Sequence, residues 1–562
     1  MSSSLFSRFA ALAAKVAAPL LLALAPCAAM GQTVNLTPWP YSISVGSGSL
    51  VLPENFVVGT AGLPSAMRAE AEKFVKDINK ATGLNARTAK KGNALIKCAK
   101  AEGIDPEGYK LNVSADGVSV SAQTATGLYY AFQTIKKMLP ANVMAGVRDA
   151  AVGSYALPTV NIDDKPRFHY RGFMLDVARH FQTVGEVKRM IDMMAAYKLN
   201  KFHWHLNDDQ GWRVEIKKYP KLTSVGSIAP GNWYVERSGK VVDSKEPYGP
   251  YFYTQEQVRE VVEYAAERHI EVIPEIDMPG HFVAALASYP EYSCNPGAKK
   301  TIWTRGGVSE DVLNVGDPKA VQFAKDILAE ICKMFPGSMV HIGGDECPTK
   351  AWEGNAQCQA LYARLGFKSY SQLQSYFTEE MANFLKKKGK KMAVWNESVT
   401  AKGADAAKVA ATGATVFCWY PAQEGALQAS KLGLNCIITP FGPYYINRKQ
   451  WADKSEPMAA GYGEDSLKAV YNYVPVPAKV PEEQKKFYVG VQGTFWSEFV
   501  GTPDYLEYLA LPRLLAIAEA GWTQQADKNF DSFVKRVRLD TKLFDYGHYY
   551  YGRHYIDGPM SR

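Results

Sequence analysis

Apolar and polar positions change their spacing once along the chain, near residue 165. Before that point, short alternating runs surround one helix-like stretch at residues 65–82 and the segment "GYKLNVSADGVSVSAQ", residues 108–123. Alternation with a period of two predicts half-buried strands, and the Asp-Gly pair inside the quoted segment predicts a hairpin. Helical spacing returns over residues 125–139. Residues 32–165 are therefore expected to form a small α+β domain, and they contain no cluster of acids, histidines or nucleophiles that would make it catalytic.

After "DDKPRFHYRG", residues 163–172, continuous apolar runs alternate with long amphipathic segments. Such runs are typical of buried parallel strands, and the segments between most of them have helical spacing. Eight such repeats predict a parallel (β/α)8 TIM barrel with insertions, over residues 166–562 and with a C-terminal helix. The predicted strands are 173–177, 201–206, 271–276, 339–344, 391–396, 415–420, 435–440 and 489–496, and the clearest predicted helices are 184–197, 254–268, 320–334 and 369–387.

Barrels of this kind carry their active sites at the C-terminal ends of the strands. In this sequence the ends of the predicted strands are rich in acids, histidines, arginine and tryptophan, whereas the beginnings carry mostly lysine and small residues. This asymmetry predicts an enzyme rather than a structural barrel. The residues concerned are Asp176, Arg179, 203–209, 275–281, Asp345, Glu346, 395–397, Trp419, Tyr445, Asn447, Trp496 and Glu498.

The first residues have a separate character. Two positive charges, Arg8 and Lys15, precede the apolar run "VAAPLLLALA" and the small residues "AMG". This pattern predicts a cleaved signal peptide over residues 1–31 and a secreted or periplasmic protein. A membrane anchor is the alternative, but prolines interrupt the run and it is too short to span a bilayer. Lipoprotein attachment at Cys27 is a further alternative, which the preceding proline disfavours.

Charge and cysteine content exclude several classes of protein. Without Arg8 and Lys15 the formal charge falls from +8 to +6, and no basic tract with interleaved aromatic residues indicates nucleic-acid binding. None of the remaining seven cysteines lies in a CxxC pair, so zinc fingers and redox motifs are not indicated. One or two disulfides would be compatible with an oxidising compartment. No feature of the sequence indicates an oligomeric state.

The segment "VHIGGDECP" places two carboxylates, Asp345 and Glu346, side by side after an apolar run. A retaining glycosidase of the usual kind needs its acid and its nucleophile on opposite sides of the bond, which neighbouring residues do not easily provide. The pair makes sense if a 2-acetamido sugar supplies its own nucleophile. Asp345 would then stabilise the acetamido group while Glu346 protonates the leaving oxygen. The alternative is a loop with an N-capping acid.

Five motifs occur in order along the predicted barrel: "VARHF", "HWHLNDDQGWR", "PEIDMPGH", "HIGGDE" and "WSE". Together they resemble glycoside hydrolase family 20, the β-N-acetylhexosaminidases, and the region in front of them is similar to the small α+β domain of that family. The resemblance implies exo-acting, retaining removal of terminal β-linked N-acetylglucosamine through an oxazolinium intermediate, with no cofactor and no metal. Acceptance of N-acetylgalactosamine is left open.

The resemblance also implies roles for individual residues. Glu346 matches the general acid/base and Asp345 the residue that orients the acetamido group. His281 and Asp208 match a pair that adjusts the protonation of the acid. The matching substrate-binding residues are Arg179 and Glu498 for sugar hydroxyls, Trp395, Trp419 and Trp496 for the acetamido methyl, and Tyr445 for the acetamido carbonyl.

Each of these residues also has a structural interpretation. Tryptophans in apolar runs are usually core residues. His281 would then cap a helix, Asp208 would form a turn pair with its neighbour, and Arg179 would form an ion pair with Asp176.

One position departs from the family pattern of Tyr-x-Asp at the seventh strand. Here "YYINR" carries Asn447 and Arg448. This pair resembles that of members which accept 6-sulfated N-acetylglucosamine, and the charge agrees, because a carboxylate repels a sulfate whereas arginine pairs with it. A solvent-directed Arg448 is the alternative.

Two other functions remain as alternatives. A secreted carbohydrate-binding protein would keep the sugar site without turnover. A metal-dependent barrel hydrolase would use His203 and His205, which share one face of a strand, with Asp208 or His281 as zinc ligands.

Overall fold

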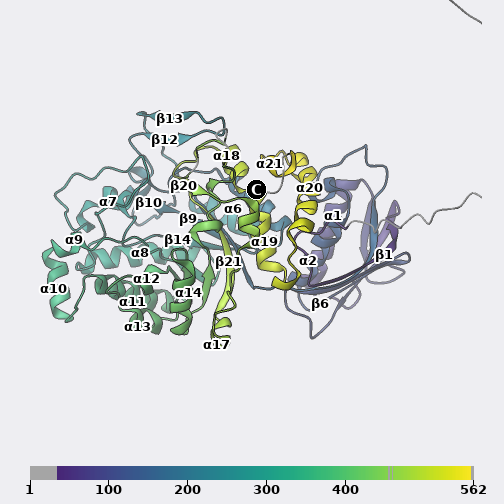
Figure 1. Ribbon diagram of the computed structural model, residues 1–562, viewed down its shortest axis with the longest axis horizontal. Helices are drawn as coiled ribbons and strands as arrows, with labels where there is room; N and C mark the ends of the chain where they lie inside the picture. Colours follow the sequence, from purple (N-terminus) through teal and green to yellow (C-terminus); the bar gives the residue numbers. More distant parts are fainter. Residues whose placement is uncertain (1–33, 453–455, 459, 558–562) are drawn as a thin grey trace, which may run out of the picture.

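The structure is a computed structural model that describes residues 34–452, 456–458 and 460–557. The predicted signal peptide lies outside these residues. Figure 1 shows the N-terminal domain and the barrel side by side, with the C-terminal helices α19 (Arg513–Trp522) and α20 (Phe530–Tyr546) between them. The predicted fold class is confirmed: an α+β domain precedes a closed (β/α)8 barrel. No helix within the described residues is long and apolar enough to cross a membrane.

The N-terminal domain is a mixed seven-stranded sheet with helices on one face. Helix α1 (Ser65–Thr82) has the predicted bounds and buries Met67, Ala71, Phe74 and Ile78, which recur at helical spacing. The predicted hairpin is β5 (Tyr109–Ser114) and β6 (Gly117–Ala122). The other elements are β1 (Ser42–Val51), β2 (Asn55–Gly59), β3 (Asn85–Ala89), β4 (Ile96–Lys100), β7 (Ala156–Asp164), α2 (Ala125–Met138) and α3 (Ala141–Ala145).

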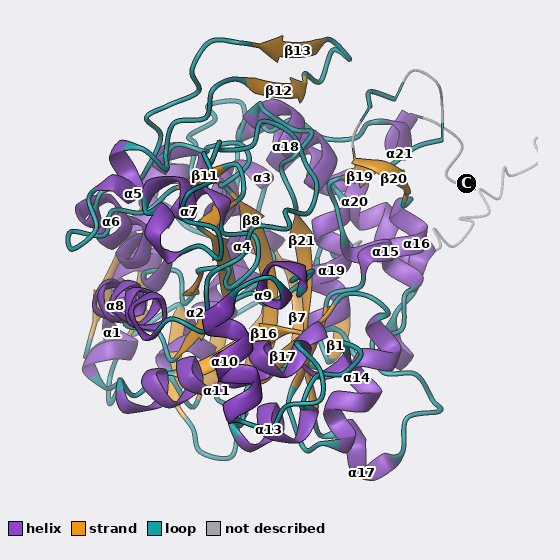
Figure 2. Ribbon diagram, turned by 90° about the vertical axis from the view of Figure 1, so that its left-hand side faces the viewer, coloured by secondary structure: helices purple, strands orange, loops and turns teal. Residues whose placement is uncertain are grey.

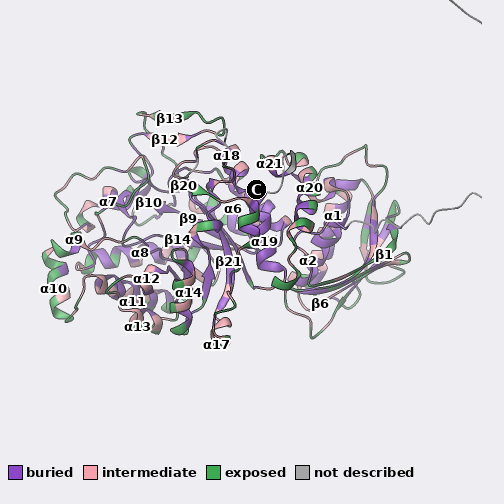
Figure 3. Ribbon diagram, in the orientation of Figure 1, coloured by how far each residue is buried: buried purple, intermediate pink, exposed green. Residues whose placement is uncertain are grey.

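The barrel closes through eight parallel strands, and each predicted apolar run supplies one of them. Because side chains on both faces are covered, these strands are buried almost throughout (Figure 3). The strands are β8 (Tyr170–Asp176), β9 (Lys201–His205), β14 (Glu271–Glu275), β15 (Met339–His341), β16 (Lys391–Trp395), β17 (Thr415–Cys418), β18 (Cys436–Ile438) and β21 (Tyr488–Phe495).

Helices with clear start signals follow several strands. In α4 (Val184–Ala196) Thr183 and Glu186 form a capping box, and in α6 (Gln255–Ala266) Thr254 and Gln257 do the same. Asp317 caps α8 (Pro318–Met334), and α11 (Ser371–Lys387) follows β15. The insertion between β9 and α6 carries a projecting hairpin, β12 (Asn232–Val235) with β13 (Val241–Ser244), at the top of Figure 2.

A buried carboxylate joins the two domains. Asp164, the last residue of β7, is 1% exposed. It accepts hydrogen bonds from Lys198 at 2.9 Å and from the indole N–H of Trp522 at 2.9 Å, both in the barrel domain. Within its own domain it accepts from Tyr109 at 2.7 Å. A buried charge needs such partners, so Asp164 ties the front domain to the barrel.

Candidate active site

The acid pair lies in a strained turn after β15. Gly343 and Gly344 have φ values of +67° and +90°, and Glu346 itself has a φ of +44°. A Cβ on Gly343 would lie 1.8 Å from Oδ1 of Asp277, and the same oxygen accepts the Gly344 N–H at 3.0 Å. Only glycine fits at position 343. The turn leaves Asp345 buried, whereas the side chain of Glu346 is 44% exposed.

His281 stands between this pair and a second acidic residue. Its Nδ1 is 3.2 Å from Oδ1 of Asp208, and its Nε2 is 3.5 Å from Oε2 of Glu346 and 3.9 Å from Oδ2 of Asp345. Burial disfavours the imidazolium, but Asp208 and hydrogen bonds to Asp209 and Glu346 raise the pKa of His281 well above its usual value. The ring is therefore a charged donor aimed at the acid pair.

Asp208 remains ionised in the interior. Burial opposes its charge, yet Arg179 and His281 hold the pKa of this carboxyl far below its ordinary value. Nη2 of Arg179 lies 2.7 Å from Oδ2 of Asp208. Arg179 also pairs with Asp176 at 3.3 Å, so the structural interpretation of that contact holds as well.

Asp277, for which the sequence predicts no role, faces Asp345. Burial and the charge of Asp345 raise the pKa of Asp277 well above its usual range, which favours a protonated Asp277 as a hydrogen-bond donor to Asp345. Burial raises the pKa of Asp345 to about 6, while His281 and the hydrogen bond from Asp277 oppose that rise. One proton shared between the two carboxyls would leave a single negative charge beside the acid.

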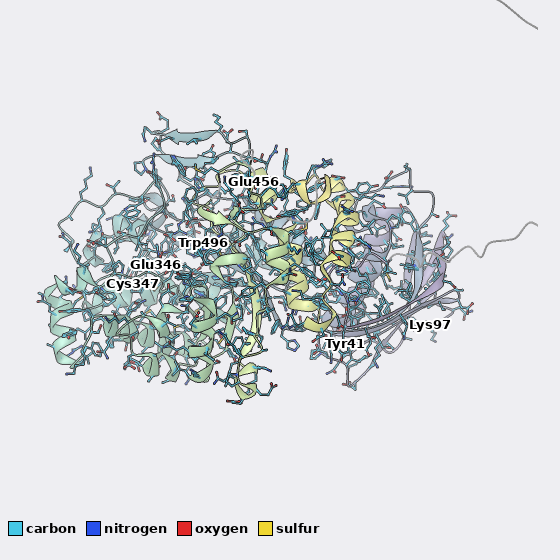
Figure 4. All side chains as sticks on the ribbon, viewed as in Figure 1. Tyr41, Lys97, Glu346, Cys347, Glu456 and Trp496 are labelled. Carbon is cyan, nitrogen blue, oxygen red and sulfur yellow. The ribbon has the colours of Figure 1, made fainter. Side chains whose placement is uncertain are left out.

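Four aromatic side chains form a wall close by. The indoles of Trp395 and Trp496 lie 5.9 Å apart, Tyr445 lies 6.1 Å from Trp496, and Trp419 stacks on Tyr445 at 6.0 Å. Figure 4 shows Trp496 in the same part of the barrel as Glu346. All four belong to one group of packed apolar residues, so the structural interpretation of the tryptophans holds.

Two glutamates for which the sequence predicts no role accept hydrogen bonds from this wall, the buried Glu275 and the half-buried Glu397. Glu275 accepts the indole N–H of Trp395 at 2.8 Å, and Glu397 accepts that of Trp419 at 2.8 Å. Burial and the nearby charge of Asp345 raise the pKa of Glu397 to about 8. Both glutamates lie next to predicted strand ends, which was the signal for finding them.

Arg179 and Glu498 line one small cavity together with Gln210 and the segment 303–306. The guanidinium of Arg179 also lies 5.0 Å over the ring of Trp496. Burial raises the pKa of Glu498, and Arg179 opposes the rise. The predicted hydroxyl-binding residues therefore adjoin the aromatic wall.

Arg448 does not point to solvent, so the solvent-directed alternative is wrong. The residue is only 9% exposed, and its Nε lies 2.8 Å from Oδ2 of Asp465. Its guanidinium packs 4.9 Å over the ring of Phe441, which in turn lies 5.5 Å from Tyr445. Asn447 is buried beside it. Asp465 directly follows β20 (Ala460–Glu464), which pairs with β19 (Arg448–Lys449), and sequence spacing alone does not reveal this contact.

Two protein-family models match this chain, one for each of its two domains. Residues 168–525 match the glycosyl hydrolase family 20 catalytic domain, and residues 33–165 match domain 2 of that family. The chain belongs to glycosyl hydrolase family 20. The family resemblance of the five motifs is thereby confirmed.

Individual family 20 proteins are similar over most of the chain. A β-hexosaminidase of Porphyromonas gingivalis is 37% identical to this chain over 91% of the chain's length, and the match covers 64% of that protein. The match to a β-hexosaminidase of Vibrio furnissii covers 66% of that protein. This chain thus spans just under two thirds of the length of these two relatives. The crystal structure of a family 20 exo β-N-acetylglucosaminidase from Vibrio harveyi, in complex with N-acetylglucosamine, is 32% identical with a TM-score of 0.78, covering 92% of this chain and 78% of that one. A β-N-acetylhexosaminidase from Streptomyces coelicolor is 30% identical with a TM-score of 0.77, covering 92% and 97%.

The two histidines of the zinc alternative, His203 and His205, are not arranged as a shared metal site. His203 and His205 do share a face, but both turn to Glu275, at 3.0 and 2.6 Å. His203 has potential metal ligands in Glu275 and His341, whereas His205 has them in Asp208 and Asp277. Among the described residues no group of such ligands contains both histidines, so the predicted zinc set is not assembled.

Proposed function

We propose that this protein is an exo-acting, retaining β-N-acetylhexosaminidase that removes terminal β-linked N-acetylglucosamine from glycoconjugates by substrate-assisted catalysis. The observation that supports it most directly is the position of His281 between Asp208 and the Asp345–Glu346 pair. A charged imidazole behind a half-exposed glutamate suits an acid that must first give and then take a proton. The neighbouring aromatic wall is the apolar surface that an acetamido methyl needs.

In the proposed reaction, the acetamido carbonyl oxygen attacks the anomeric carbon while the bond to the leaving oxygen breaks. Glu346 gives its proton to that oxygen, and the ionised Asp345 stabilises the positive charge that develops on the acetamido nitrogen. The product is a cyclic oxazolinium ion. Water then attacks the anomeric carbon and gives a proton to Glu346, which reopens the ring with β configuration and restores the acid.

Substrate positioning follows from the surroundings. Arg179 and Glu498 would bind the hydroxyls of the terminal sugar, and Tyr445 would donate to its acetamido carbonyl. Asp277, Glu275 and Glu397 would act only through the residues that they contact.

Acceptance of 6-sulfated sugars is the finer part of the proposal. Asn447 offers a neutral side chain where a carboxylate would repel sulfate. Arg448 packs on the ring of Phe441, and Phe441 in turn packs against Tyr445. Because Arg448 is paired with Asp465, a sulfate would compete with that carboxylate. We therefore propose tolerance of the sulfated sugar. We also propose that the protein acts outside the cytoplasm, on the basis of the N-terminal sequence.

The test is release of 4-nitrophenol from its β-N-acetylglucosaminide and from the 6-sulfated analogue. Turnover of both supports the whole proposal, and turnover of the neutral sugar alone removes the sulfate part. Binding without turnover would favour the carbohydrate-binding alternative. Glu346→Gln should reduce kcat by roughly 10²–10⁴-fold. The exposed Glu353→Gln is its matched control and should leave kcat unchanged. NMR of the first sugar released should detect the β anomer.

A further inference from the structure

A single buried carboxylate, Glu275 at the end of β14, contacts both halves of the candidate active site. It has no exposed surface. Its Oε1 accepts the indole N–H of Trp395 at 2.8 Å, on the side of the aromatic wall. Its Oε2 lies 2.6 Å from Nδ1 of His205 and 3.0 Å from Nε2 of His203. Both oxygens are therefore occupied by fixed partners, as a carboxylate without water requires.

His205 carries this contact toward the general acid. While its Nδ1 faces Glu275, its Nε2 lies 3.0 Å from Oδ2 of Asp208. Since both ring nitrogens face carboxylate oxygens, both must donate, which makes the ring an imidazolium. Burial opposes this charge, but Glu275 and Asp208 raise the pKa of His205 to about 10. His205 is thus a fixed positive charge between two carboxylates.

The result is a row of four groups with alternating charge that leads to the acid, Glu346. Its links measure 2.6, 3.0, 3.2 and 3.5 Å. The groups, in order, are Glu275, His205, Asp208, His281 and Glu346. Asp208 is also fixed by Arg179, so the row has a rigid centre. A displacement of Glu275 would be transmitted to Glu346 through these four contacts. It would be transmitted to the aromatic wall through the single hydrogen bond from Trp395.

We propose that Glu275 is a positioning residue that aligns the His281 relay with the aromatic wall. Through His205 and Asp208 it orients the imidazole behind Glu346, and through its other oxygen it orients the indole of Trp395. The inference rests on the proposed function and deepens it: one buried side chain keeps the acid and the acetamido surface in register.

The first test is Glu275→Gln, measured on two substrates. The amide keeps the shape and can still accept from Trp395, but it lacks the charge that holds His205 protonated. With a poor leaving group, as in N,N'-diacetylchitobiose, kcat should fall by about 10–100-fold, because the reaction depends on general acid catalysis. With the 2,4-dinitrophenyl glycoside, whose leaving group needs little protonation, the loss should stay below about 3-fold. Equal losses on both substrates would overturn the relay role.

A double-mutant cycle gives the second test. If Glu275 acts through His281, adding Glu275→Gln to a His281→Asn enzyme should cost less than about 2-fold in kcat. Independent, multiplying losses would contradict the proposal. Glu275→Leu removes the acceptor for Trp395 as well and should raise KM above that of Glu275→Gln. An unchanged KM between these two variants would overturn the role toward the wall.

The matched control is Tyr170→Phe, at the far side of the same buried network. Its hydroxyl donates to Gln492 at 2.8 Å, and Gln492 contacts His203 rather than His205. This variant should keep kcat and KM within about 2-fold. If the wild type hydrolyses neither substrate, the proposed function itself fails. If the wild type is active and Glu275→Gln does not discriminate between leaving groups, only this inference fails.

Discussion

Nε2 of His281 lies 3.5 Å from Oε2 of Glu346, so one imidazole stands directly behind the acid. Asp208 keeps this ring protonated, and the ring stabilises Glu346 when it is ionised. His281→Asn should therefore lower kcat/KM, by about 10–100-fold, with the greater loss for substrates that have poor leaving groups. Steady-state kinetics with a series of aryl glycosides measures this dependence.

The control for that variant is His269→Asn. His269 also has a left-handed backbone, with φ of +57° against +46° for His281, and it also faces a carboxylate, Glu70 at 3.0 Å. Asparagine tolerates this conformation at both positions. A loss of the same size in the control would show that the effect comes from the backbone or from folding.

The pH dependence should report the ionisation of Asp345. Its proposed role needs the carboxylate, and its pKa is raised to about 6, so kcat/KM should fall as the pH drops through about 6. Asp277→Ala removes the hydrogen bond that opposes this rise, which should move the acidic limb to higher pH. Asp277→Asn keeps a donor and should leave the limb in place. Identical profiles for the two variants would contradict the shared-proton arrangement.

Sulfate tolerance should depend on Asp465. Oδ2 of this carboxylate lies 2.8 Å from Nε of Arg448 and competes with a sulfate for the guanidinium. Asp465→Asn should therefore raise the ratio of 6-sulfated to neutral turnover, by roughly 3–10-fold. Burial raises the pKa of Asp465 to about 6, with Arg448 and Arg513 opposing. Protonation of Asp465 weakens its ion pair with Arg448, and the wild-type ratio should therefore increase as the pH falls through about 6.

Two further variants serve as controls for the predicted ratio of sulfated to neutral turnover. Glu464→Gln changes the exposed neighbouring acid and should leave the ratio unchanged. Replacement of Asn447 by Asp together with Arg448→Leu should abolish turnover of the sulfated sugar while sparing the neutral one. A ratio that no variant alters would show that the sulfate does not reach Arg448.

Stability should depend on the carboxylate between the domains. Asp164→Ala leaves Lys198 buried without its partner, which costs about 3–5 kcal/mol of unfolding free energy. The neighbouring Asp163→Ala serves as the control, because that side chain is 52% exposed and 3.6 Å from Lys110. It should cost less than about 0.5 kcal/mol. Urea denaturation followed by tryptophan fluorescence compares the two.

The barrel could be predicted because buried parallel strands appear in sequence as apolar runs, and all eight runs became strands. The ends of those strands could be predicted less well. The apolar run at 339–344 suggested six strand residues, but the left-handed Gly343 and Gly344 end β15 at His341. Backbone conformation at a glycine depends on what lies opposite it, here Asp277, which is distant in sequence.

The candidate site was predictable where a motif placed chemistry at a strand end, and the structure brings Asp208, His281, Asp345 and Glu346 together. Supporting residues were harder to find. Glu275 ends a strand as a lone acid, and nothing in its neighbours reveals that its partners are histidines of β9 and a tryptophan of β16. The burial of Arg448 likewise depends on Asp465, a contact between separate segments.

The buried carboxylate of Asp164 that joins the two domains also limits how this chain can change by recombination. Its partners Lys198 and Trp522 lie more than three hundred residues apart, at opposite ends of the barrel sequence. A front domain exchanged for one without a carboxylate at this position would leave a buried ammonium and a buried indole N–H without acceptors. Exchange of the front domain should therefore succeed only with donors that carry the acid, so the two domains are expected to be inherited as a pair.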